Sequence, residues 1–306
     1  MNNPTNPLPP LLLTHLLQRS PARLLAATHA PFLAHAGRGQ LSLEQLSAWL
    51  TQDRIYAQAY LRFAARLLAA VPLPRQVVST PDLHVRIADW LLAALVNVRR
   101  ELGFFEDVAV RWGVRLDAWS QETAAPAHGE AHGLTEGTRA YLELFEDVGA
   151  RVEAGRGGLL GGLVVLWGTE KCYLESWRYA RSFLESTPQI TTTSSSPTNP
   201  DQDAATTALR DHLIPNWTSD DFVHFVNDID ALVTELWQQQ CHHNHHEHAA
   251  SPLKLILEPR PGTTGTTGTE TQPSTPELQL ELARLEALWE RVLDVEIRFW
   301  PEVEET

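Results

Sequence analysis

The sequence predicts an all-α protein, and three observations support this class. We find no convincing run of period-two alternation, the pattern of half-buried strands. Long segments instead carry apolar residues at steps of three and four, which places those residues on one helix face. Helix start signals precede several of these segments. With 306 residues, of which 43% are hydrophobic, the chain has ample apolar material for a core.

The expected helices begin at recognisable signals. Ser20-Pro21 is typical of a helix start, Ser42 with Gln45 forms a capping box, and Thr135 and Ser219 stand at N-cap positions. Two further starts are Thr80-Pro81-Asp82 and Thr275-Pro276-Glu277. By residue number, the expected helices cover about 21–37, 43–70, 83–103, 104–112, 136–154, 159–185, 220–240 and 277–300.

Two segments interrupt the helical pattern. Residues 187–207 are rich in Ser, Thr and Pro, which predicts a mobile loop. Residues 241–275 contain a His-rich tract followed by an almost pure Gly/Thr stretch. The terminal helix 277–300 is too apolar on one face to stand alone, so it must return to the main core. We therefore expect one helical domain over 1–306, with these two segments as insertions.

Composition excludes several classes of function. Formal net charge is −14, from 24 basic and 38 acidic residues, which disfavours binding to nucleic acid or to an anionic membrane. No apolar run approaches the roughly 20 residues that span a bilayer. The N-terminus lacks the basic start of a secretion signal. Cys172 and Cys241 can form one bridge at most and are expected as free thiols. The predicted location is cytoplasmic, with the nucleus left open.

Four carboxylates occupy positions where their helices should be apolar. Asp53, Glu101, Glu170 and Glu296 each fall on the apolar stripe of a long amphipathic segment. A buried, unpaired carboxylate costs several kcal/mol unless it is hydrogen-bonded or protonated. Taken singly, each acid fits a structural role better, and Glu101 also fits a surface ion pair with its arginine neighbours. Taken together, flanked by Tyr and Trp, the four acids predict a polar pocket inside a helical bundle.

Several motifs then resemble one known family. Gln52-Asp53-x-x-Tyr56 followed by Tyr60-x-x-Phe63 resembles the signature helix of the TenA/thiaminase II family. The segments 217–222 and 295–300, and Tyr141 after Thr138-Arg139, resemble further motifs of that family in matching order. The resemblance covers most of residues 10–240 and 277–302. It implies the haem-oxygenase-like all-α fold and a homodimer or homotetramer.

The chain departs from the cysteine branch of that family. That branch carries a nucleophilic cysteine four residues before a tyrosine; with Tyr173 as that tyrosine, Thr169 stands at the nucleophile position. Residues 166–177, and Trp217, resemble the glutamate branch instead, in a eukaryotic, fungal-type member. Cys172 lies about 200° around a helix from Glu170, so we expect it to face away and to serve structure.

The resemblance implies thiamin or its breakdown products as substrates, built on a 4-amino-2-methylpyrimidine. We expect a hydrolase that cleaves a C–N bond of an aminomethyl- or formylaminomethyl-pyrimidine, without metal or organic cofactor. The alternative is a non-catalytic pyrimidine-binding or regulatory protein. Glu170 and Glu296 are the expected acid and base. The expected substrate-binding residues are Asp53, Tyr56, Glu101, Tyr141, Tyr173, Trp217 and Phe299.

Histidines raise two other possibilities. The tract His242, His243, His245, His246 and His248 adjoins the Gly/Thr stretch and lacks the spaced ligands of a zinc site. We expect a solvated segment that binds metals adventitiously. Haem is disfavoured, because no histidine carries an axial-ligand motif.

Overall fold

The all-α prediction is confirmed by the structure, a computed structural model that describes residues 8–76, 82–116, 133–156, 158–186, 200–249 and 275–303. The described residues form helices and no strands. The helices are α1 (Leu12–Arg19), α2 (Pro21–Thr28), α3 (Pro31–Arg38), α4 (Leu43–Ala70), α5 (Leu83–Trp112), α6 (Glu136–Glu153), α7 (Gly158–Ser186), α8 (Pro200–Ala208), the π-helical turn η1 (Leu209–Leu213), α9 (Ile214–Trp217), α10 (Asp220–Ala249) and α11 (Pro276–Phe299).

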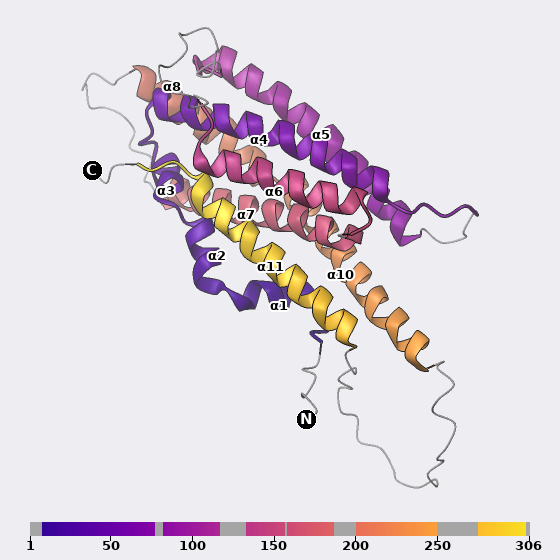
Figure 1. The fold of residues 1–306 in the computed structure, drawn as a ribbon. Helices are drawn as coiled ribbons and strands as arrows, with labels where there is room; N and C mark the ends of the chain where they lie inside the picture. Colours follow the sequence, from indigo (N-terminus) through magenta and orange to yellow (C-terminus); the bar gives the residue numbers. More distant parts are fainter. Residues whose placement is uncertain are drawn as a thin grey trace, which may run out of the picture.

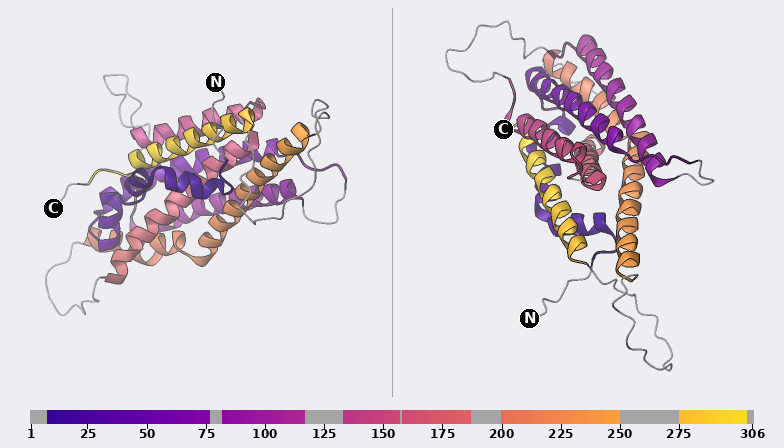
Figure 2. Two further views of the ribbon diagram at one scale, coloured as in Figure 1. Left: turned by 90° about the horizontal axis from the view of Figure 1, so that it is seen from below. Right: turned by 45° about the vertical axis from the view of Figure 1, so that its right-hand side comes forward.

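Helix α7 lies at the centre of the bundle. It packs against α2, α3, α4, α6, α9, α10 and α11, whereas α4 joins it to the outer helix α5 (Figures 1 and 2). Residues 160–170 of α7 are all buried, the pattern of a helix surrounded on every side. Its Trp167 and Trp177 belong to a set of fully buried tryptophans from several helices. Side chains on all sides of the middle of α7 are therefore part of the core.

Several expected helix starts appear as predicted. Ser42 and Gln45 form a reciprocal capping box at α4, and the Thr135 side chain accepts from the Thr138 N–H at α6. Asp82 caps α5 and Thr275 caps α11. Such caps satisfy N–H groups that have no partner within their helix.

Two expected helix boundaries are wrong. Helix α5 runs unbroken through Gly103 to Trp112, because the buried Phe105 and Val108 continue its apolar face. The left-handed cap falls instead at Gly113, with φ 72°. The single helix expected over 21–37 is two, because Pro31 forces the residue before it into an extended conformation.

Helices cover parts of both segments that were expected to interrupt the helical pattern. Residues 200–208 form α8, whose Pro200 and early acids suit a helix start and whose Ala205 and Ala208 face the core. Helix α10 continues to Ala249, since Cys241 extends the buried stripe of Val233 and Trp237. Residues 187–199 and 250–274 lie outside the described residues, as do the side chains of 243–249. The expectation for the histidine tract stays a prediction.

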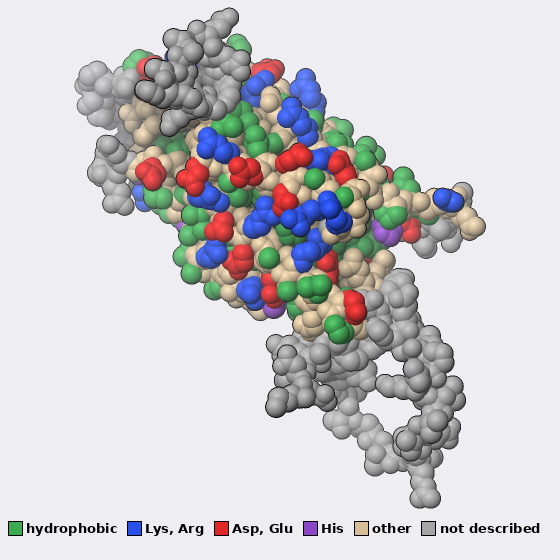
Figure 3. All heavy atoms as spheres, in the orientation of Figure 1, with side chains coloured by type: hydrophobic (Ala, Val, Ile, Leu, Met, Phe, Trp, Pro, Cys, Tyr) green, Lys and Arg blue, Asp and Glu red, His purple; other side chains and the backbone are tan. Residues whose placement is uncertain are grey.

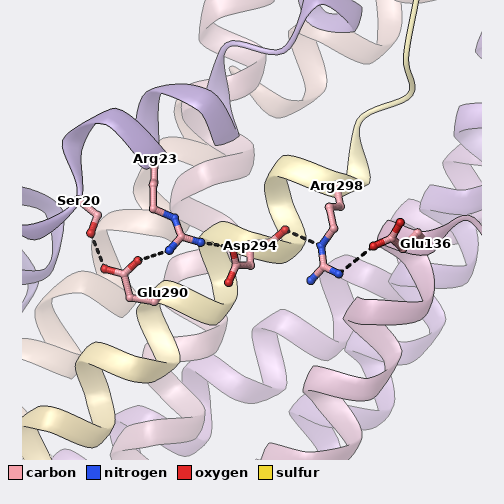
Figure 4. Close-up of polar contacts among 6 residues, drawn as sticks. All are labelled: Ser20, Arg23, Glu136, Glu290, Asp294 and Arg298. Atoms are coloured by element: carbon pink, nitrogen blue, oxygen red, sulfur yellow. Dashed lines mark hydrogen bonds and ion pairs between the residues drawn. The ribbon is translucent and has the colours of Figure 1, made fainter.

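The outer face of the bundle carries interspersed charges. On the face in Figure 3, acidic and basic side chains alternate rather than gather by sign. Polar contacts tie α11 to its neighbours: Glu290 accepts from Ser20 and, at 2.8 Å, from Arg23, and Arg298 reaches Glu136 of α6 at 3.1 Å (Figure 4). Within the described part of the chain, no helix has an apolar stretch long enough to cross a bilayer.

Candidate active site

A cavity of about 620 Å³ opens between α4, α5, α7 and the α9–α10 junction. Its volume falls within the range of small-molecule sites. Six of the nine predicted site residues line it: Asp53, Tyr56, Glu101, Glu170, Tyr173 and Trp217. The other lining residues are Ala57, Tyr60, Asn97, Val98, Arg100, Phe104, Asn216, Ser219, Asp221, Phe222 and Phe225.

Asp53 projects from α4 into the buried part of the cavity. Its side chain is nearly inaccessible to solvent, and the Tyr173 hydroxyl of α7 donates a hydrogen bond to Oδ2 at 2.9 Å. Oδ1 has no partner among the described residues. Burial raises the pKa of Asp53 well above its usual value, the Glu101 charge raises it further, and the Tyr173 hydrogen bond opposes the shift. Asp53 therefore lines the cavity with one side-chain oxygen that has no hydrogen-bond partner among the described residues.

Glu101 lies in the cavity wall rather than in a surface ion pair. The indole N–H of Trp217 donates a hydrogen bond to its Oε1. Burial raises the pKa of Glu101 to about 7, opposed by that hydrogen bond and by the Arg100 charge. Trp217 itself is fixed by stacking on Trp177, with ring centroids 4.7 Å apart. Glu101 and Trp217 therefore form one connected wall.

Glu170 enters the same cavity from α7. Its side chain is only 8% exposed. Burial raises the pKa of Glu170 to about 8; the Tyr60 hydroxyl opposes the shift and the Glu101 charge adds to it. At neutral pH this carboxyl is mostly protonated, so it can donate a proton as well as accept a hydrogen bond.

Glu296, Tyr141 and Phe299 are not part of the cavity lining, contrary to the expectation of one common pocket. Tyr141 and Phe299 pack against Tyr56, whose ring centroid is 4.7 Å from that of Tyr141 and 5.7 Å from that of Phe299. The reason is that α11 packs on α2, α6 and α7, away from α5 and α10. Burial raises the pKa of Glu296 to about 8, opposed by Tyr141. Burial, and then the charges of Glu170 and Glu296, raise the pKa of Tyr56.

The two residues of α7 that were considered as nucleophiles, Thr169 and Cys172, are both buried. The Thr169 hydroxyl is buried and donates to the Leu166 carbonyl at 2.9 Å. Cys172 is buried and does not line the cavity. Burial, and then the charge of Glu296, raises the pKa of its thiol, which works against a reactive thiolate.

Sequence reasoning missed the outer part of the lining. Asn97 and Phe104 lie one turn before and after Glu101, so helical spacing alone could have found them. Phe222 belongs to a quoted motif, but Asn216 and Phe225 carry no signal of their own. The assembled cavity is acid-rich and has tyrosine hydroxyls, so it suits a ligand with several hydrogen-bonding nitrogens.

Comparisons with known proteins address the fold and the relatives. No protein-family model matches the chain. A "Probable transcription factor" of Fusarium pseudograminearum (strain CS3096) is 30% identical over 252 residues, covering 76% of this chain and 47% of that protein. The chain thus spans about half the length of this curated relative.

Several solved structures match almost the whole chain. A TenA homologue from Pyrococcus furiosus gives a TM-score of 0.57 at 18% identity, covering 94% of this chain and 98% of that one. A TenA family transcription regulator from Silicibacter sp. TM1040 gives 0.58 at 15% identity, covering 94% of each chain. A TenA homologue from Pseudomonas syringae pv. tomato gives 0.55 at 10% identity, covering 97% and 99%. The chain has the fold of the TenA homologues. This fold is the haem-oxygenase-like all-α bundle that the resemblance implied.

Proposed function

We propose that the chain is a TenA-type hydrolase of the glutamate branch, acting in the cytoplasm on a thiamin breakdown product. The substrate is an aminomethyl- or formylaminomethyl-pyrimidine, and a C–N bond of its arm is cleaved without metal or organic cofactor. The observation that carries this proposal is one cavity lined by Asp53, whose Oδ1 has no partner among the described residues, and by Glu170, whose pKa burial raises to about 8. The TenA fold and the quoted motifs add support.

Two of the lining acids, Asp53 and Glu170, have a defined task in this proposal. Asp53 accepts a hydrogen bond from the amine or a ring N–H of the pyrimidine and so orients the ring. Glu170 gives its proton to the arm nitrogen as the C–N bond breaks. Water adds its oxygen to the arm carbon, and its proton restores the acid. Tyr173 and Trp217 hold Asp53 and Glu101 in place.

Glu296 is given an indirect role. It does not line the cavity, so we assign it no direct proton transfer to the substrate. Glu170, which lines the cavity, is therefore the candidate for direct proton transfer.

The test combines turnover with binding. Positioned acid–base catalysis contributes about 10²–10⁴-fold, so Glu170→Gln should lower kcat for ammonia release by that order and keep most pyrimidine affinity. Asp53→Asn should weaken binding, because an N–H then meets the ligand in place of an acceptor. Glu175→Gln is the matched control on α7, because Glu175 pairs with Lys171 at 2.7 Å outside the cavity. Wild-type turnover by Glu170→Gln, together with an inactive Cys172→Ser protein, would reject the glutamate assignment.

A second candidate is a non-catalytic pyrimidine-binding regulator. The names of the Fusarium relative and of the Silicibacter protein favour it, since both refer to transcription. The net charge of −14 argues against direct contact with DNA. Pyrimidine binding without any turnover by the wild-type protein would select this candidate.

We also propose that the chain assembles as a homodimer or homotetramer. Leu92, Val96 and Val110 are 50%, 69% and 88% exposed and lie along one outer face of α5. A second copy packed there would remove this apolar surface from water. Light scattering that gives a 34.2 kDa particle would contradict the proposal.

A further inference from the structure

The hydrolysis proposed above needs a group that accepts the proton of the attacking water. Asp53 orients the ring and Glu170 protonates the leaving nitrogen, so neither is free for this task. Two other acids line the cavity, Glu101 of α5 and Asp221 of α10. Asp221 is exposed and lies in the first turn of α10, where the helix dipole alone favours an acid. Glu101 is therefore the remaining candidate.

Trp217 holds the carboxyl group of Glu101 in one orientation. The indole N–H of Trp217 donates to Oε1, and no described residue donates a hydrogen bond to Oε2. The Trp217 ring is fixed in turn by stacking on Trp177, with centroids 4.7 Å apart. Glu101 is partly accessible to solvent, whereas Asp53 and Glu170 are buried. Glu101 therefore combines a fixed carboxyl group with access for water.

The same aromatic cluster connects Glu101 to Asp53. The Tyr173 hydroxyl donates to Oδ2 of Asp53 at 2.9 Å. The Tyr173 ring meets the Trp217 ring edge-on, with centroids 5.2 Å apart and planes at 85°. Asp53 and Glu101 are thus held by two side chains that contact each other. A ring oriented by Asp53 and a water held by Glu101 would share one cavity.

Glu101 and Glu170 favour different protonation states. Burial raises the pKa of Glu101 to about 7, against the Trp217 hydrogen bond and the Arg100 charge. Burial raises the pKa of Glu170 to about 8; the Tyr60 hydroxyl opposes the shift and the Glu101 charge adds to it. Between these pKa values Glu101 is mostly ionised and Glu170 mostly protonated, the states of a base and of an acid. An ionised Glu101 also helps to keep the proton on Glu170.

We propose that Glu101 is the general base of this hydrolysis and that Trp217 is its positioning residue. The inference rests on the proposed function and assigns a second catalytic residue to that site. The Glu101 carboxylate takes a proton from water, and the water oxygen bonds to the arm methylene. The carbon–nitrogen bond breaks, its electron pair stays on nitrogen, and Glu170 gives that nitrogen a proton. Ammonia leaves, and the proton on Glu101 returns to Glu170 through water in the cavity.

The test is the pH dependence of ammonia release from 5-aminomethyl-2-methylpyrimidin-4-amine. The wild-type kcat should rise with pH as Glu101 ionises and fall as Glu170 loses its proton. Glu101→Gln should lower kcat by about 10²–10⁴-fold, remove the rising limb and keep the falling limb. Trp217→Phe keeps an aromatic ring but removes the N–H donor, so the rising limb should move to higher pH. Glu106→Gln is the matched control on α5, because Glu106 is exposed, pairs with Arg54 at 3.6 Å and does not line the cavity.

The variants are needed to assign the limbs of the pH profile, because other ionisable side chains line the same cavity. These are Asp53, Tyr56 and Tyr60 of α4, Arg100 of α5, Tyr173 of α7 and Asp221 of α10. Interacting acids titrate as a group, so the rising limb belongs to Glu101 only if Glu101→Gln removes it.

The outcomes separate this inference from the proposed function. Wild-type turnover together with an unchanged kcat in Glu101→Gln would overturn the inference alone. A lower kcat at every pH with both limbs in place would also overturn it, because a structural role gives that result. If the wild-type protein releases no ammonia, the hydrolase proposal fails and the inference fails with it.

Discussion

Substitution of Glu296 by glutamine should change how the stability of the protein depends on pH. Glu296 is 1% exposed, and its Oε2 has no partner among the described residues. Burial raises its pKa from the usual 4.5 to about 8. The folded protein therefore keeps a proton on this carboxyl in a pH range where the unfolded chain has released it.

The sign and size of the effect follow from proton linkage. Between pH 4.5 and about 8 the folded state binds more protons at this site, so the free energy of unfolding falls as pH rises. The slope is about 1.4 kcal/mol per pH unit for one group. From about pH 5 to about pH 7 this carboxyl alone should lower the stability by about 2–3 kcal/mol. The glutamine variant lacks the titrating group and so loses this slope.

Urea unfolding at both pH values measures the difference. Any constant cost of placing the amide in the core cancels, because only the change of the variant-minus-wild-type free energy with pH is read. That quantity should rise by about 2–3 kcal/mol toward pH 7. Glu290→Gln is the control on α11, because Glu290 contacts Arg23 on the outer face. Parallel profiles of Glu296→Gln and the wild type would show that Glu296 is ionised in the folded protein, and would refute the reasoning.

Two further predictions concern the packing of α11. Gly137→Ala should destabilise the protein by about 1–3 kcal/mol in thermal or urea unfolding, because a Cβ there would lie 2.3 Å from the Arg298 carbonyl oxygen. Gly103→Ala, whose Cβ would meet nothing closer than 3.9 Å, should be neutral or stabilising, and a loss there equal to that of Gly137→Ala would contradict the steric argument. Arg23→Ala should cost only about 0–1 kcal/mol, less at high salt, because the side chain of Arg23 is 39% exposed and those of its partners Glu290 and Asp294 are 26% and 53% exposed (Figure 4). A larger loss of stability that does not depend on salt would show that these ion pairs stabilise the fold by more than exposed pairs usually do.

Local sequence signals predicted most of the helices. The capping box at Ser42 and the caps at Thr135 and Thr275 are contacts between residues three apart, so a reader of the chain can recognise them. The length of α5 was harder to predict, because Gly103 is a stop signal only if the apolar face also ends there. Phe105 and Val108 continue that face, and tertiary packing outweighs the propensity of one glycine.

The candidate site could be predicted from the sequence only in part. Helical periodicity placed Asp53, Glu170 and Glu296 on buried faces, and all three are buried. Periodicity says that a face is covered, but not which helix covers it. Asp53 and Glu170 meet at the cavity because α4 and α7 both border it, whereas Glu296 does not line it. The stacking of Trp90 on Phe225 depends on α5 meeting α10, a pairing that no local signal encodes.

Glu170 and Glu296 are both buried, but they differ in position relative to the cavity. Both have a pKa near 8 for the same main reason, burial, so their acidity alone does not distinguish their roles. Position does, because a proton donor must lie within hydrogen-bond reach of the atom that it protonates. Glu170 borders the cavity in which we propose that a ligand binds, and Glu296 does not. Burial, and then the charges of Glu170 and Glu296, raise the pKa of Tyr56, so its hydroxyl stays protonated. The chemistry that we propose therefore places Glu170 at the substrate and gives Glu296 no direct contact with it.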